Sequence, residues 1–410
     1  MAPPNTAAAR DDGTRIQGTS SAEDLWLRLP DDLLSMVYAR LASPIDCVRF
    51  AVVCVQWRAV VSSCPPRRAH PWLVLDPHDG AETKRVYNPG DGTILPLTTL
   101  LRETDGCRFV GCHAGGWVAY EAPLRVKNVF TGDEVALPAD PRRSIVTLKV
   151  TFSRPPTLSG SILAAITDKH EVVICGLGKP EGGWMARRFC GEPVLDITFC
   201  NGHLYCLMRN SNEVAKFEVG LDRYGVPMFG HIQWLAIQNH HYMKNRFFWS
   251  EVDPDAHAMY IVELRGKLAM AVRRIWGPRA RERNFPGPFF LVFELVDANE
   301  HITGTRCLYK WEMVLNMGDH ALYLGPTCSK AMHVPTDQHG GPRRNHIYYF
   351  HHRCYTRKEL VPGDAKEFFT SSNKKDCRVY YKEDEIFGNW QTSVGYYVVG
   401  GAHPPTWLFP

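Results

Sequence analysis

The sequence of 410 residues lacks the features that would assign it to several large classes of protein. Its formal net charge is only +4, whereas a nucleic-acid binder concentrates basic residues in a patch or stripe. The first 24 residues contain no apolar segment of the kind found in signal peptides, and no N-x-[ST] acceptor occurs in the chain. No apolar run is long enough to cross a bilayer. We therefore expect a protein of the cytoplasm and/or nucleus that binds neither nucleic acid nor membrane.

Motifs of catalysis and of cofactor or metal binding are also missing. There is no G-x-S-x-G and no H-E-x-x-H sequence. The segment Gly176-Leu177-Gly178-Lys179 resembles a phosphate loop, but Pro180 follows where Ser or Thr would bind magnesium. His351-His352-Arg353-Cys354 has no further ligands nearby, so we interpret it as a loop rim. We expect no catalytic residue, no cofactor and no metal.

The 13 cysteines are odd in number and irregular in spacing. The group Cys107-x4-Cys112-His113 lacks the spacing of a haem or zinc motif, and no second pair completes it. Without a signal for secretion, a reducing compartment is expected, where Cys serves as a small buried apolar residue. The sequence thus favours core cysteines over disulfides.

A cluster of arginines lies in the segment RRIWGPRARERNFPGP, residues 273–288. Arginines of this kind could hold an acidic or phosphorylated target, because guanidinium pairs bidentately with such groups. The interpretation we favour is a solvated, proline-rich excursion between strands, since charge runs in loops are common.

The amino-terminal region combines a polar tail, residues 1–22, with a short apolar module. Pro30 fits the first position of a helix and is followed by two aspartates, and apolar residues then recur at spacings of three and four. The pattern predicts three short helices that end at Pro65-Pro66. A unit of this size usually needs help to be stable. The additional stabilisation comes either from packing on the next domain or from docking on another protein.

Beyond residue 66 the pattern changes to short strands and turns. VYNPGDGTILP (86–96) and KNVFTGDEVALP (127–138) resemble each other, and their closing prolines lie 42 residues apart. Asn201-Gly202 and Arg265-Gly266 each separate two apolar strands and predict hairpins. The spacing predicts a mainly β fold, with a β-propeller of six to eight blades favoured over a sandwich.

The module of residues 23–64 resembles an F-box. It has the leucine-proline start Leu29-Pro30-Asp31-Asp32-Leu33-Leu34, a central Leu41 and the ending Val53-Cys54-x-x-Trp57-Arg58, with Asp32 and Met36-Val37 as small departures. The resemblance implies docking on the Skp-family adaptor and, through it, on a cullin. The adaptor-binding residues that it implies are Leu29, Pro30, Leu33, Leu34, Val53, Cys54 and Trp57.

Residues 65–410 resemble the C-terminal β-propeller-like domain of a plant-specific group of F-box proteins. The resemblance rests on PPRRAHPWLVL, GGWVAY, DITFCNGHLYCL, WEMVLNMGDHALYLG, HIYYF and PPTWLFP, which occur in this order. It implies a non-catalytic subunit of a cullin-based ubiquitin ligase whose propeller binds an unidentified target protein. Two alternatives stay open: a scaffold or decoy without ligase output, and a propeller enzyme with a site assembled from distant loops.

Overall fold

The computed structural model describes most of the chain from Leu29 onward. The described residues are 29–41, 46, 49–51, 53–64, 70–76, 84–90, 92–97, 107–121, 123–139, 146–189, 192–209, 213–238, 257–274, 289–302, 305–334, 341–350, 366–369, 378–384, 392–399 and 403–410. The chain forms two compact units, Met1–Arg67 and Arg68–Pro410, which we call the helical unit and the propeller. The predicted tail of residues 1–22 lies outside the described residues.

The helical unit contains α2 (Asp31–Tyr38) and α4 (Val55–Ser63). Helical backbone at Asp46 and at residues 49–51 belongs to a third helix between them, so the prediction of three short helices is confirmed. Pro30 lies one position before α2 with an extended ψ of 147°, rather than at the first helical position as predicted. Its carbonyl oxygen nevertheless accepts the first helical hydrogen bond, from the Leu34 amide at 3.0 Å.

The described strands of the propeller form six sheets that we label A to F. Sheet A consists of β27 (Thr406–Leu408), β1 (Trp72–Leu75), β2 (Arg85–Tyr87) and β3 (Ile94–Pro96). Sheet B consists of β4 (Phe109–His113), β5 (Trp117–Tyr120), β6 (Arg125–Asn128) and β7 (Glu134–Val135). Sheet C consists of β11 (Trp184–Arg188), β10 (Glu171–Gly176), β9 (Ile162–Thr167) and β8 (Thr147–Phe152).

The remaining three sheets contain four, five and six strands. Sheet D consists of β12 (Val194–Cys200), β13 (His203–Met208), β14 (Val214–Leu221) and β15 (Pro227–Trp234). Sheet E consists of β16 (Ile237–Gln238), β20 (Thr305–Met313), β19 (Phe289–Ile302), β18 (Lys267–Arg274) and β17 (His257–Leu264). Sheet F consists of β22 (Lys330–His333), β21 (His320–Leu324), β23 (His346–Phe350), β26 (Thr392–Val399), β25 (Arg378–Asp384) and β24 (Lys366–Phe369).

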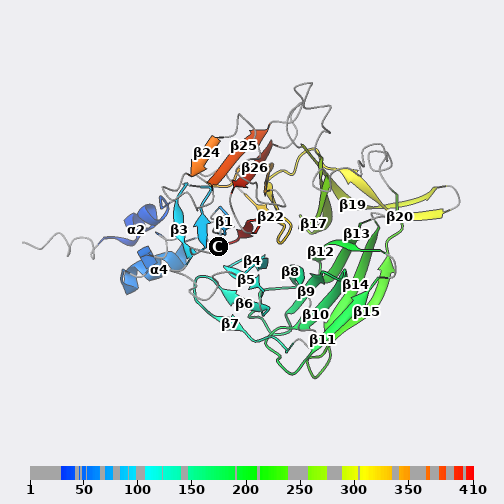
Figure 1. Ribbon diagram of the computed structural model, residues 1–410. Coiled ribbons are helices and arrows are strands. Elements are labelled where there is room, and N and C mark those ends of the chain that lie inside the picture. The colour runs from blue at the N-terminus through cyan, green and yellow to red at the C-terminus, as the bar shows by residue number, and fades with distance from the viewer. Residues whose placement is uncertain are drawn as a thin grey trace, which may run out of the picture. The chain divides into compact units, whose positions relative to one another are not determined.

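The sheets follow one another around a centre, as in a propeller (Figure 1). An edge strand of each sheet contacts the edge strand of the next in the series β27, β4, β8, β12, β17 and β22. Hydrogen bonds from sheet A to sheet F complete the ring: the Trp407 indole nitrogen donates to the Leu324 carbonyl oxygen at 3.1 Å, and the hydroxyls of Thr327 and Thr406 lie 2.9 Å apart.

The mainly β fold and the propeller are as predicted, but the predicted count of six to eight blades is not matched. The propeller has five blades, one fewer than the number of its sheets. Four neighbouring strands pair antiparallel in each of sheets A to E, and sheet E adds β16 in parallel to β20. Sheet F departs from this pattern, because β23 pairs in parallel with both β21 and β26. The 42-residue spacing of the first two sheets does not persist, since sheet F alone extends from His320 to Val399. Extrapolating that spacing over the chain therefore overestimated the number of blades.

Apolar side chains fill the spaces between neighbouring sheets. In β9, Leu163 and Ala165 face the cluster shared with sheet B, while Ile162, Ala164 and Ile166 face the cluster shared with sheet D. All six residues of β9 are buried. A strand that is covered on both faces reads as a continuous apolar run rather than as an alternation, which explains the sequence ILAAIT.

The predicted turns have the expected geometry. Asn201 and Gly202 have φ values of 47° and 77°, and they connect β12 to β13. Arg265 and Gly266 have φ values of 54° and 74° between β17 and β18. Positive φ at both central residues matches the twist of the flanking strands. Both hairpin predictions are therefore confirmed.

The two similar segments of sheets A and B close with the same turn. The Asn88 carbonyl accepts the Gly92 amide, and the Asn128 carbonyl accepts the Gly132 amide, each at 2.9 Å. Each asparagine side chain also accepts an amide two residues ahead, from Gly90 at 3.0 Å and from Phe130 at 2.9 Å. The sequence similarity is thus a repeated structural turn.

Sheets B and C approach each other closely at Gly111 of β4, and substitution of this glycine tests that contact. A Cβ at Gly111 would lie 2.5 Å from the Val150 carbonyl oxygen, whereas a Cβ at Gly220 in β14 would meet no heavy atom within 4 Å. We expect Gly111→Ala to lower the free energy of unfolding by about 1–3 kcal/mol, as overpacking does. Gly220→Ala should stay within about 0.5 kcal/mol of the wild type. Denaturant unfolding of the purified chain measures both, and equal stabilities would contradict the contact.

Candidate functional site

The seven residues implied as adaptor contacts divide into an inner and an outer group. Leu34 is fully buried and forms a cluster with Tyr38, Phe50 and Val60. Leu29 and Trp57 are partly buried and pack against that cluster. The Trp57 ring lies 4.2 Å from the Phe50 ring, centroid to centroid. These inner side chains hold the helices together. The sequence motif alone does not distinguish residues that pack inside the unit from residues that contact an adaptor.

The outer group is exposed. Leu33 and Val53 have 43% and 50% of their surface accessible, and Pro30 is also exposed. Cys54 is partly buried and is counted with this group because it does not belong to the internal cluster. Three further apolar side chains outside the implied contact set are also exposed: Met36, Val37 and Val55. In α2, Leu33, Met36 and Val37 follow the helical spacing of one face, and the buried Leu34 and Tyr38 follow that of another. Helix α2 is therefore apolar on two faces, and only one of them serves the internal cluster.

A cavity of about 480 Å³ lies at the edge strands of the propeller. Strands β4, β8 and β12, the β17–β18 turn and the region of β21 and β22 line it. Charged and titratable side chains are prominent in the wall: His113, Lys149, Glu263, Arg265, His320, Lys330 and His333. Burial lowers the pKa of the His113 imidazole, and the Lys330 ammonium acts in the same direction. The cavity is thus a polar pocket at the centre of an apolar scaffold.

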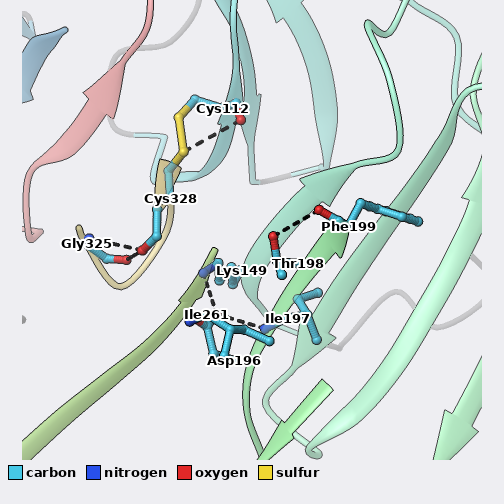
Figure 2. Close-up of polar contacts among 10 residues, drawn as sticks. Cys112, Lys149, Asp196, Ile197, Thr198, Phe199, Ile261, Gly325 and Cys328 are labelled. Atoms are coloured by element: carbon cyan, nitrogen blue, oxygen red, sulfur yellow. Dashed lines mark hydrogen bonds and ion pairs between the residues drawn. A yellow bond between two sulfur atoms is a disulfide. The ribbon is translucent and has the colours of Figure 1, made fainter. Parts of the chain in front are cut away.

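One wall of the cavity contains a buried ion pair between Lys149 of β8 and Asp196 of β12 (Figure 2). The Asp196 carboxylate also accepts the amides of Ile197 and Ile261, each at 2.8 Å. Burial raises the pKa of this carboxyl, and Lys149 opposes that change. Because its partners come from β8, β12 and β17, Asp196 connects sheets C, D and E through one side chain.

The opposite part of the wall contains a disulfide between Cys112 of β4 and Cys328, which follows β21 (Figure 2). Their Cα atoms lie 6.0 Å apart although 216 residues separate them in the sequence. The expectation that cysteines serve only as small apolar residues is therefore wrong for this pair. The sequence could not predict the bond, because two cysteines this far apart form no local sequence pattern. The expectation is confirmed for Cys200 and Cys206, which are free and buried, and Cys175 is buried as well.

The basic segment of residues 273–288 begins inside the propeller. Arg273 belongs to β18, which pairs with both β17 and β19, and its side chain is fully buried with the guanidinium 5.8 Å from the centre of the Tyr349 ring. The interpretation as a solvated loop is therefore wrong for Arg273, because the strand extends further than the arginine pattern indicated. Residues 275–288 and His351-His352-Arg353-Cys354 lie outside the described residues.

Within the described residues, no cluster of three or more His, Cys, Asp or Glu side chains is arranged to hold a metal ion. Gly176 ends β10, and the chain continues into strand β11 rather than into the helix that a phosphate loop requires. None of the described helices has the length and apolarity needed to span a bilayer.

The division of the helical unit predicts different outcomes for adjacent leucines. Leu34→Ala removes a fully buried side chain and should cost the helical unit about 2–5 kcal/mol. Leu33→Ala, at an exposed position, should change its stability by less than about 0.5 kcal/mol. Hydrogen exchange of the α4 amides in the full chain reports both, and acceleration by Leu33→Ala alone would reverse the assignment.

The buried ion pair predicts a large effect of removing one charge. Asp196→Asn leaves the Lys149 ammonium without its carboxylate and should cost about 3–5 kcal/mol of unfolding free energy. Glu134→Gln is the matched control, because Glu134 and its partner Arg125 are 40% and 44% exposed and a surface pair of this kind contributes less than about 1 kcal/mol. Urea unfolding compares the two variants, and equal costs would show that Asp196 is not needed for the junction of sheets C, D and E.

Comparison with known families places both units. Residues 26–69 match the family model for the F-box domain, and residues 86–381 match the model described as KIB1-4 beta-propeller. The two matches follow the order of the helical unit and the propeller, and the propeller match leaves out β1, β26 and β27.

Curated relatives from Arabidopsis thaliana share shorter segments. “Probable F-box protein At4g22060” is 29% identical over 121 residues, which cover 28% of this chain and 29% of the relative. “F-box protein At1g69090” is 26% identical over 156 residues, 34% of this chain and 38% of the relative. “F-box protein At2g14500” is 28% identical over 130 residues, 31% of this chain and 34% of the relative. The chain thus spans about a third of the length of these relatives. Because the propeller model covers most of the chain and an F-box match precedes it, the chain belongs to the plant F-box proteins with a C-terminal KIB1-4 β-propeller.

Proposed function

We propose that this chain is the substrate-recognition subunit of a cullin-based ubiquitin ligase of the SCF type. Its F-box docks on a Skp-family adaptor, which connects it to a cullin, and its propeller binds a target protein. The observation that carries the proposal is the F-box match over a helical unit whose α2 presents an apolar outer face. A ligase subunit of this kind acts in the cytoplasm and/or nucleus.

The exposed side chains support docking on a protein partner. Val55 is 81% accessible and Met36 is 49% accessible, beside Leu33 and Val53 from the implied contact set. Apolar side chains that gather on a small unit are typical of interaction sites, because their burial in a complex releases water. We assign docking to the outer residues Leu33 and Val53, with Pro30 and Cys54 beside them. Leu29, Leu34 and Trp57 support them from inside.

The propeller suits target binding because loops from every sheet meet at one rigid surface. The polar cavity is our candidate for part of that surface, since it combines charged side chains with a buried, well-packed wall. The chain itself catalyses no bond change in this proposal. Holding target lysines close to the activated ubiquitin raises their effective concentration to about the millimolar range.

Affinity capture from plant extract tests the proposal with a double variant, Leu33→Asp/Val53→Asp. Trp57 stays unchanged because its ring packs on Phe50. Two charges on the outer residues should reduce the recovery of adaptor and cullin more than tenfold, while proteins bound to the propeller remain. Quantitative mass spectrometry of the captured proteins gives both numbers.

Leu158→Asp/Leu315→Asp is the matched control, because these propeller residues are 52% and 51% accessible. This control should recover adaptor and cullin at the wild-type level. Adaptor capture that is insensitive to Leu33→Asp/Val53→Asp would refute the docking surface. Capture of adaptor without cullin by the wild-type chain would instead favour a scaffold or decoy.

A further inference from the structure

We propose that the Cys112–Cys328 disulfide is a reversible redox site, opened by small thiols, that locks the last strand of the propeller into its ring. The inference concerns the propeller and rests on the cytoplasmic or nuclear localisation proposed above, not on adaptor docking or target binding. Disulfides are rare in the cytoplasm and nucleus, and those that occur there are usually redox-sensing or transient. The surroundings of this disulfide provide both an access route and a structural consequence.

The disulfide joins the two sheets that flank the ring closure. Cys112 belongs to β4 of sheet B and Cys328 follows β21 of sheet F, while β27 of sheet A contacts β4 and hydrogen-bonds to sheet F. The residue after β27, Phe409, is also held, because its carbonyl oxygen accepts the Gly116 amide at 2.8 Å. Linking sheets B and F covalently therefore restrains the two neighbours between which β27 inserts.

Both cysteines line the cavity of about 480 Å³, which makes them reachable by a small molecule. They are otherwise buried, at 8% and 5% accessibility, so a large protein reductant has little surface to approach. Cys200 lines the same cavity as a free thiol, and burial raises its pKa to about 12. It is therefore a weak nucleophile at neutral pH and a natural control.

Opening the bond follows ordinary thiol–disulfide exchange. A thiolate of a low-molecular-weight thiol such as glutathione attacks one sulfur, forming a mixed disulfide while the other cysteine leaves as a thiolate. The thiolate of a second small thiol then attacks the small-molecule sulfur of the mixed disulfide. The second cysteine is released as a thiolate, and the two small thiols leave joined as their disulfide. Two thiols are oxidised and one protein disulfide is reduced to two cysteines.

The test equilibrates the purified full chain in glutathione buffers with graded ratios of reduced to oxidised form. Differential alkylation with peptide mapping measures the redox state of Cys112 and Cys328, and hydrogen exchange follows Thr406–Leu408. We expect the pair to convert reversibly within the series. Reduction should lower Tm by about 3 °C or more and accelerate exchange at least tenfold in β27.

Two variants distinguish the effect of the Cys112–Cys328 disulfide from general effects of thiols. In Cys112→Ala/Cys328→Ala, hydrogen exchange in β27 should be as fast as in the reduced wild type and should not change with the glutathione ratio. In Cys200→Ala, exchange in β27 should change with the glutathione ratio as it does in the wild type. If the double variant fails to fold, the wild-type titration decides alone. The proposal is overturned if Cys112 and Cys328 stay reduced or stay oxidised at every glutathione ratio. It is also overturned if hydrogen exchange in β27 does not depend on their redox state. Adaptor capture should be the same in both redox states, so failure here leaves the ligase proposal intact.

Discussion

The pairing of β27 with β1 is the interaction on which the propeller depends. It sets Trp72 opposite Leu408 and Leu73 opposite Trp407, so that sheet A is made from the first and last strands of the unit. Without β27, β1 would present an unpaired edge within the propeller, and its backbone groups would lose their ladder hydrogen bonds. The ladder therefore converts a row of sheets into a closed ring.

Side-chain packing reinforces this ladder. Trp407 is fully buried, and its ring lies within 6 Å of those of Tyr323, Phe350 and Tyr396 of sheet F. Aromatic pairs in such tilted and edge-on arrangements add to the stability that burial alone provides. Sheet F is thus attached to sheet A by rings as well as by hydrogen bonds. The irregular strand order of sheet F is compatible with ring closure because this contact uses its β21 and β26 strands together.

Local patterns in the sequence predicted much of this structure. Asn201-Gly202 and Arg265-Gly266 specified their hairpins because turn geometry depends on adjacent residues. The blade count and the Cys112–Cys328 bond were not predictable in this way, since they depend on which distant strands meet. At the candidate docking surface, family resemblance pointed to the right segment. It could not separate the exposed Leu33 from the buried Leu34, because both fit an apolar helix and only packing distinguishes them.

Ring closure also has a consequence for how the protein is made. Strand β27 follows every other strand of the propeller, so a ribosome must release nearly all of the unit before sheet A can be completed. The helical unit leaves the ribosome first and can assemble its small cluster while the sheets are still being synthesised. During that interval, half-built blades expose strand edges to other nascent chains. Chaperones that cover such edges would therefore act on the propeller late in synthesis, after the F-box is already available for binding.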